Sequence, residues 1–355
     1  MDPRLEALGW DTRWEAVRST VTTPASDELA PARVAVQHRG GYVLYGAAGE
    51  SAGAVSGRFR HESRAPADFP VVGDWVLVRD GVIHAVLPRR TIFSRRDPFD
   101  LAEQVAAVNI DVVFVVVGLD VAPNLRRLER YLTVAYESGA EPVILLNKAD
   151  LCADPDVALA AVGAVAPGTP VQLVSARSGS GLEVFDAYCR PGRTAAFLGP
   201  SGVGKTTLLN TLAGTDRPTA DIRADGRGRH TTTHRELVLV EGRGLVIDTP
   251  GMRELQLWDA EAGLSAVFGD IDALARACQF GDCAHVTEPG CAIRAALDDG
   301  RLAADRYASY RKLEREEAFI SKKRDALALS EEKRQRKIFA RSIRRSGWRG
   351  RDSID

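Results

Sequence analysis

Gly199-Pro200-Ser201-Gly202-Val203-Gly204-Lys205-Thr206 follows an apolar run at residues 195–198 and precedes a helical pattern at residues 206–212. A strand, then G-x-x-x-x-G-K-[ST], then a helix is the context of a phosphate-binding loop. The glycines let backbone N–H groups converge on phosphate oxygens, and the helix N-terminus adds its dipole. We therefore expect a nucleotide site that extends to Thr207, with Lys205 bridging the β- and γ-phosphates and Thr206 ligating Mg²⁺. The alternative is a Gly-rich turn that holds no ligand.

A second segment predicts which base is bound. Asn147-Lys148-Ala149-Asp150 follows directly on the apolar run 143–146. The Asp150 carboxylate can accept two hydrogen bonds, from N1–H and the exocyclic amine of guanine, whereas adenine would leave that carboxylate unpaired. Ser175-Ala176-Arg177, which follows a predicted strand at 171–174, matches the second base-contacting loop of GTPases. Beside a phosphate loop, these segments indicate guanine nucleotides.

Two further segments are expected to sense the γ-phosphate. Asp248-Thr249-Pro250-Gly251 follows a predicted strand at 245–247, so that Asp248 would hold Mg²⁺ through water and the Gly251 amide would contact the γ-phosphate. Gly228-Arg229-His230-Thr231-Thr232-Thr233 lies between this segment and the phosphate loop. A threonine here would complete the Mg²⁺ shell only when GTP is bound. The sequence does not distinguish the three threonines, and we take Thr232 as the candidate. The alternative is a Thr-rich surface loop.

The position that usually activates water departs from the pattern of Ras-like GTPases. Met252 stands where Ras-like GTPases carry a water-orienting Gln. A thioether cannot orient water, so we expect slow unaided turnover. His230 is the candidate that would orient water in place of this Gln. The catalytic candidates are therefore His230, Lys205 and Thr232. The alternative is a structural or solvated histidine.

Three of the five cysteines cluster with a histidine near the C-terminus, in the pattern Cys278-x4-Cys283-x-His285-x5-Cys291. Three thiols and one imidazole form the ligand set of a tetrahedral structural Zn²⁺ site, and a complete set leaves no open position for catalysis. An odd number of cysteines argues against a disulfide framework and indicates a reducing compartment. The alternative is a set of unrelated buried cysteines.

Composition and charge limit the remaining possibilities. The chain is 45% apolar and has a net charge of −1, but residues 333–351 hold nine Lys or Arg and no acidic residue. An acidic body with a basic tail indicates a polyanionic partner such as nucleic acid; the alternative is a solvated or disordered tail. The most apolar run, 112–119, is too short to span a bilayer, and the start has no signal-peptide pattern. We therefore expect a cytoplasmic protein without membrane contact.

Four regions can be separated along the chain. Residues 1–30 form a lead segment with one short helix. Short predicted strands with Gly turns at 33–37, 42–45, 73–78 and 82–86 indicate a small β-barrel over 31–98, of OB type or SH3-like. Over 99–262, strands alternate with helices such as 125–137, which predicts a parallel sheet with helices on both faces. The chain as a whole is therefore expected to be a multidomain α/β protein. Residues 263–355 are expected to form a zinc-binding helical domain, with one or two charged helices at 311–338 and a basic tail.

The order of the nucleotide motifs is unusual. In ordinary GTPases the phosphate loop comes first, whereas here Asn147-Lys-Ala-Asp and Ser175-Ala-Arg precede it. This order predicts a circularly permuted P-loop GTPase domain, which can rebuild the same site because chain ends in such folds lie at the surface.

With a barrel before it and a Cys/His cluster after it, this arrangement closely resembles the small ribosomal subunit biogenesis GTPase family over nearly the whole chain. The resemblance implies an OB-type barrel, a permuted GTPase and a zinc-bearing helical domain. It also implies GTP hydrolysis in late maturation of the small ribosomal subunit, stimulated by that subunit, with rRNA binding. We expect a monomer with GTP, Mg²⁺ and one Zn²⁺. Two alternatives stay open: a GTP-regulated RNA-binding module with little turnover, and an ATP-using enzyme, which Asp150 disfavours.

Overall fold

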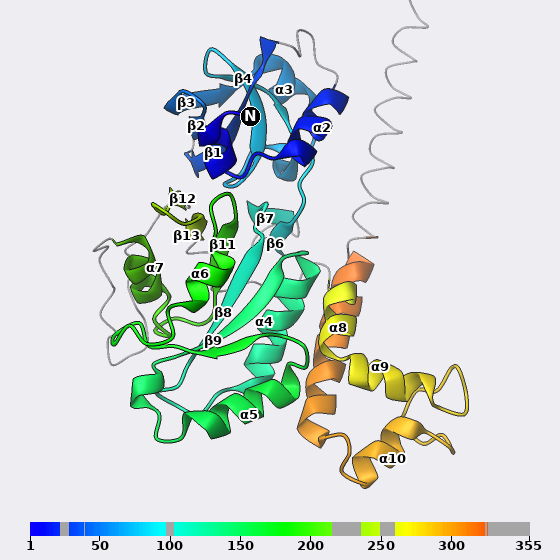
Figure 1. Ribbon diagram of the computed structural model, residues 1–355. Coiled ribbons are helices and arrows are strands. Elements are labelled where there is room, and N and C mark those ends of the chain that lie inside the picture. The colour runs from blue at the N-terminus through cyan, green and yellow to red at the C-terminus, as the bar shows by residue number, and fades with distance from the viewer. Residues whose placement is uncertain are drawn as a thin grey trace, which may run out of the picture.

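The computed structural model describes residues 1–21, 28–38, 40–96, 103–214, 236–248, 260–323 and 325. A barrel, a sheet flanked by helices and a group of helices follow one another along the chain (Figure 1). The strands of the barrel are β1 (Ala30–Gln37), β2 (Tyr42–Gly46), β3 (Gly49–Val55), β4 (Trp75–Arg79) and β5 (Val82–Val86). The later strands are β6 (Ile92–Arg96), β7 (Glu103–Val108), β8 (Val112–Gly118), β9 (Glu141–Asn147), β10 (Val171–Leu173), β11 (Thr194–Leu198), β12 (Glu236–Leu239) and β13 (Leu245–Asp248).

Helices occur in the lead segment, in the barrel region, among the later strands and in the C-terminal part. Those with both ends described are α1 (Pro3–Ala7), α2 (Thr12–Thr20), α3 (Gly57–Glu62), α4 (Leu125–Glu137), α5 (Pro155–Val165), α6 (Val184–Tyr188), α7 (Lys205–Ala213), α8 (Glu261–Val267), α9 (Gly269–Arg276) and α10 (Ala292–Asp298). A further helix begins at residue 304 and is described to residue 323, so the charged helix predicted from 311 starts earlier. None of the described helices has both the length and the apolar character needed to cross a membrane.

The five barrel strands close on themselves in the order β1-β2-β3-β5-β4, and β4 pairs back to β1. The pairing of β3 with β5 is parallel, and the other barrel pairings are antiparallel. This is a closed five-stranded barrel of the expected OB type. The sequence did not predict β3, because its Gly, Ala and Ser residues show no hydrophobic alternation; the strand forms because β2 and β5 pair with its two edges.

The sheet that follows, here called the central sheet, has the order β10-β9-β8-β11-β13-β12. All pairings are parallel except that of β12 with β13. Alternate residues of β8 enter two different cores: Val113 and Val115 pack on the side of α4, and Val112 and Phe114 pack on the side of α7. This double burial explains the continuous apolar run of β8 and confirms the predicted sheet with helices on both faces.

The barrel and the central sheet are joined edge to edge. β1 pairs with β12 at Val36 and Glu236, so the two parts form one continuous 11-stranded sheet. The predicted boundary between residues 98 and 99 falls between β6 and β7, which form a separate two-stranded sheet in the described part of the chain. The barrel therefore lies beside the strand that leads out of the segment 215–235, where the sequence predicts the γ-phosphate sensor.

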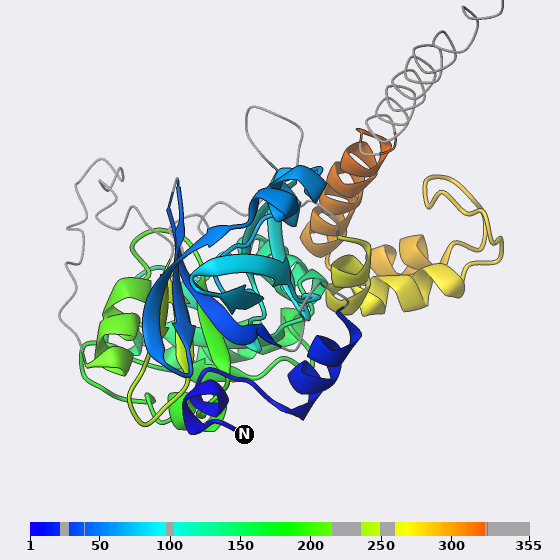
Figure 2. The ribbon, with the colours of Figure 1, turned by 90° about the horizontal axis from the view of Figure 1, so that it is seen from above.

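The lead segment contains two helices, α1 and α2, where the sequence predicted one, and both lie beside the barrel strands (Figure 2). Trp10 and Trp14 pack against Trp75 at the start of β4. The buried Arg33 guanidinium donates to the backbone carbonyls of Leu8, Gly73 and Asn109, in the lead segment, the barrel and the loop before β8.

The helical part is fixed to α4. α8 packs against α4 so closely that a Cβ on Gly263 would lie 2.1 Å from the carbonyl oxygen of Thr133. Arg306, only 7% exposed, donates to the carboxylates of Glu129 on α4 and Asp270 on α9. The predicted boundary between 262 and 263 therefore falls inside α8, a helix that packs both on the region of the central sheet and on the helical part.

Trp14→Ala should lower the free energy of unfolding by about 3–5 kcal/mol, because the Trp14 ring is 2% exposed and its removal leaves a cavity at this junction. Arg58→Ala is the control, because it breaks only an exposed pair with Glu62 and should cost less than about 1 kcal/mol. Urea unfolding measures both. Equal losses in the two variants would show that the lead segment is not packed as described.

Candidate functional site

The phosphate loop connects β11 to α7 in the middle of the central sheet. β11 lies between β8 and β13, and its carboxyl end opens into Gly199, which has φ +148°. A Cβ on Gly199 would lie 2.4 Å from the carbonyl oxygen of Val116, and one on Gly204 would lie 2.3 Å from the amide nitrogen of Asn147. Neither position can take a side chain without moving its neighbours, so both glycines are required by close approach.

The remaining loop residues surround this backbone. Lys205 Nζ donates to the carbonyls of Gly199 and Pro200, at 2.6 Å each, which places the ammonium over the loop. Ser201 and Gly202 are exposed, whereas Val203 is buried. Thr206 and Thr207 lie in the first turn of α7 and are half-buried. The loop therefore has a backbone cradle, a cation and a hydroxyl at a helix N-terminus, the groups that bind phosphates.

Asn147, the last residue of β9, ties the loops together. Its amide nitrogen donates to the carbonyl of Val203 at 2.7 Å, and its amide oxygen accepts from the backbone N–H of Ala176 at 3.1 Å. The side chain is 1% exposed. One buried amide thus joins the phosphate loop to the loop after β10.

The other tetrad residues lie beside this contact. Asp150 Oδ1 accepts a hydrogen bond from the Ser175 hydroxyl at 2.6 Å, which holds one oxygen of the carboxylate. The backbone N–H of Ala149 donates to the carbonyl of Val174 at 3.2 Å. The sequence-predicted residues of the two base loops are therefore brought together at the ends of β9 and β10.

One residue of this region was missed by sequence reasoning. Asp120, in the loop after β8, accepts an ion-paired hydrogen bond from Lys148 Nζ at 2.8 Å. Its only sequence signal is its place two residues past the end of β8, the strand between the phosphate-loop strand and the tetrad strand.

The predicted Mg²⁺ residues come from neighbouring strands. Asp248 is the last residue of β13, which pairs in parallel with β11 through Ala196 and Ile247. Because parallel strands end at the same edge, Asp248 lies on the side of the sheet where the phosphate loop begins. The sequence-predicted His230, Thr232 and Gly251, and the neighbouring Met252, lie outside the described residues.

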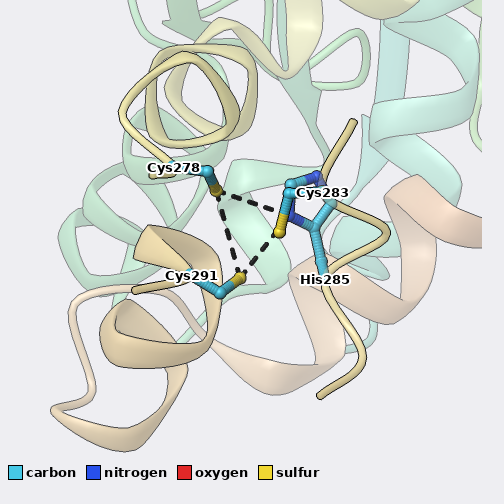
Figure 3. A group of neighbouring side chains, drawn as sticks. All are labelled: Cys278, Cys283, His285 and Cys291. Atoms are coloured by element: carbon cyan, nitrogen blue, oxygen red, sulfur yellow. Dashed lines mark hydrogen bonds between the residues drawn. The ribbon is translucent and has the colours of Figure 1, made fainter. Parts of the chain in front are cut away.

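The four predicted metal ligands meet in a loop between α9 and the start of α10 (Figure 3). Their ligand atoms all lie within 4.8 Å of one another. The Sγ atoms of Cys278 and Cys291 are 4.0 Å apart, and each lies 3.5 Å from His285 Nδ1. A tetrahedral Zn²⁺ with its usual bond lengths requires about 3.8 Å between sulfurs and about 3.5 Å between sulfur and nitrogen. Cys278, Cys283, His285 and Cys291 therefore fit a single small cation.

Backbone groups support this cluster. Partial burial opposes ionisation of the Cys278 thiol, but the amides of Ala292 and Ile293 at the start of α10 hold its pKa below the usual value. Glu288, which sequence reasoning missed, accepts from the backbone N–H groups of Ala284, Val286 and Thr287. Hydrogen bonds from its own backbone and from Val286 and Ala284 lower the pKa of Glu288 to about 2. These bonds fold the loop around His285, which has φ +61°.

Comparison with known proteins agrees with this arrangement. A family model for RsgA GTPase matches residues 86–258. The chain is 46% identical to a protein named small ribosomal subunit biogenesis GTPase RsgA from Opitutus terrae, over 99% of this chain and 98% of the relative. A protein of the same name from Syntrophotalea carbinolica is 42% identical over 97% of this chain and 98% of its own length.

Two solved structures share the architecture. YjeQ from Thermotoga maritima superimposes with a TM-score of 0.61 at 26% identity, over 82% of this chain and 99% of its own. YloQ, described as a circularly permuted GTPase, superimposes with a TM-score of 0.58 at 23% identity, over 85% and 99%, a likeness of fold alone. The predicted multidomain α/β fold with a permuted nucleotide-binding sheet is confirmed.

Proposed function

This chain belongs to the family of small ribosomal subunit biogenesis GTPases, and we propose that it hydrolyses GTP in late maturation of the small ribosomal subunit. Membership of this family implies GTP as the nucleotide and Mg²⁺ as its metal ion. The observation that carries the proposal is the Asn147 amide, which joins the phosphate loop to the base loops in one buried contact.

Guanine recognition is assigned to the loops after β9 and β10. Asp150, held through Oδ1 by Ser175, would accept the N1–H and exocyclic amine of guanine. The backbone at Ala176, which is held in place by the hydrogen bond from its N–H to the Asn147 amide oxygen, would face the guanine oxygen. A base without two adjacent donors leaves the Asp150 carboxylate unpaired, which is the physical basis for rejecting adenine.

Phosphate binding and charge neutralisation are assigned to residues 199–207. Backbone N–H groups of the loop and the N-terminus of α7 would bind the β-phosphate, and Lys205 would move from the loop carbonyls to the β- and γ-phosphates. Mg²⁺, when bound, supplies positive charge to the developing phosphate anion. Thr206 would ligate it directly and Asp248 through water. Gly251, Thr232 and His230 complete the proposed set, with His230 as the group that would orient water.

The partner is proposed to be the small ribosomal subunit, bound through its rRNA. The relatives' names refer to that subunit. The basic run at 333–351 supports a polyanionic partner, because Lys and Arg neutralise phosphates. We further propose a monomer that acts in the cytoplasm.

Phosphate release from GTP should be slow for the protein alone and rise at least about tenfold when small ribosomal subunits are added. ATP should not be hydrolysed under either condition. Asp150→Asn should lower GTP affinity by about tenfold to a hundredfold, because one charge-assisted hydrogen bond to the base is lost. Asp156→Asn, which removes an exposed carboxylate on α5, is the matched control.

Absence of phosphate release in both conditions would contradict the hydrolase proposal. The outcome would then favour a GTP-regulated RNA-binding module, for which Met252 in place of the usual Gln is the supporting observation. ATP binding as tight as GTP binding would instead indicate an ATP-using enzyme.

We also propose that Cys278, Cys283, His285 and Cys291 hold one structural Zn²⁺. The sulfur and nitrogen distances support this ion, and four protein ligands leave no position for a substrate. Zinc would stabilise the loop between α9 and α10 rather than take part in hydrolysis.

The purified protein should carry one zinc per chain, measured by elemental mass spectrometry. Cys291→Ser should lose it, because one of four ligands is removed, and chelation should lower the melting temperature of the unmodified protein. Cys152→Ser, at a half-buried thiol outside the cluster, should keep the metal. Full zinc content in Cys291→Ser would contradict the assignment.

A further inference from the structure

The loop after β8 lies where a bound nucleotide has to cross the sheet. In the order β9-β8-β11, β8 separates the tetrad strand from the phosphate-loop strand, and all three are parallel. A nucleotide held by phosphates at the end of β11 and by its base at the end of β9 therefore spans the end of β8. The sugar of that nucleotide has to lie over this loop, whose residues so far have no assigned role.

This loop is packed against both halves of the site. The backbone N–H of Leu119 donates to the Asn147 carbonyl at 2.8 Å, which fixes the loop to β9. At Gly118, a Cβ would lie 2.7 Å from Asp120 Oδ1 and 3.6 Å from Val203 Cγ1 in the phosphate loop. The Asp120 carboxylate thus folds over a glycine at the point where the tetrad and phosphate loops meet.

Lys148 reaches from the tetrad across to this carboxylate. Its backbone has φ +64° and ψ +33°, a left-handed conformation that a non-glycine residue adopts at some cost. Its ammonium lies 2.8 Å from Asp120 Oδ2, with the two side chains 21% and 41% exposed. Among the described residues Asp120 is the only acidic partner of Lys148, so the lysine side chain is fixed at both ends, by its backbone and by this ion pair.

We propose that Asp120 is a positioning residue for guanine nucleotides that acts through Lys148. The ion pair holds the lysine stem across the end of β8, where it forms the surface under the sugar and base. Without Asp120 the lysine samples other rotamers, and ordering it again costs binding energy each time a nucleotide enters. The inference rests on the proposed guanine-nucleotide function and adds a residue outside the tetrad to its specificity machinery.

The exposure of the pair gives it a measurable signature. A half-exposed ion pair contributes at most about 1 kcal/mol and is screened by salt. Asp120 should therefore contribute more to nucleotide affinity at low ionic strength than at high ionic strength. The hydrogen bonds of Asn147 are buried and uncharged, so their contribution should change little with salt.

The test is calorimetric titration of the full chain with GDP and GTP, in low and high salt. Asp120→Asn keeps the shape and removes the charge, and should weaken both nucleotides about fivefold in low salt and less in high salt. In steady state it should raise KM for GTP more than it changes kcat. Asp120→Glu, which restores the carboxylate, should recover part of the loss. Asp156→Asn removes an exposed charge on α5 and should leave both affinities unchanged.

A double-mutant cycle tests whether Asp120 acts on the nucleotide through Lys148. Lys148→Met retains the apolar stem and removes the ammonium, so Asp120→Asn should cause no further loss in that background. An equal loss in both backgrounds would overturn the proposal, because Asp120 would then act directly on the nucleotide. An affinity of Asp120→Asn equal to that of Asp156→Asn would also overturn it. Failure of the unmodified chain to bind GDP or GTP would instead contradict the proposed function itself.

Discussion

The buried amide of Asn147 is the contact on which the nucleotide site depends. It donates to the carbonyl of Val203 and accepts from the N–H of Ala176, so one side chain sets the spacing between the phosphate loop and the base loops. Breaking either bond would leave a buried polar group unpaired, at a cost of about 1–3 kcal/mol. The same contact requires glycine at position 204, because any side chain on Gly204 would displace this amide.

Because this link acts through space, the order of the segments along the chain can change while the site stays intact. β9 and β10 come before β11 in sequence, yet parallel pairing brings all their carboxyl ends to one edge of the sheet. The permutation changes what is attached to the site. The chain leaves β13 toward α8, which is fixed on α4 with the Arg306, Glu129 and Asp270 network close by. The γ-phosphate sensor predicted before β12 leads instead to the strand that pairs with the barrel.

The sequence was sufficient for features that depend on local pattern. The β-branched run of β8, the glycines of the phosphate loop and the four-ligand cluster each carry their signal within a few residues. What it missed depends on partners far along the chain. β3 is a strand because two neighbours pair with it, and Asp120 matters because Lys148, twenty-eight positions away, folds back onto it. Glu288 was missed for another reason: its partners are backbone N–H groups, which have no sequence signature.

Asn147→Asp preserves the shape of this side chain and replaces the amide donor by a second acceptor facing the Val203 carbonyl. Calorimetric titration with GDP, alongside a urea unfolding curve, gives the answer. We expect the affinity for GDP to fall by about tenfold to a hundredfold, since the carboxylate repels that carbonyl and separates the phosphate loop from the base loops. An affinity within about twofold of the unmodified protein would contradict it.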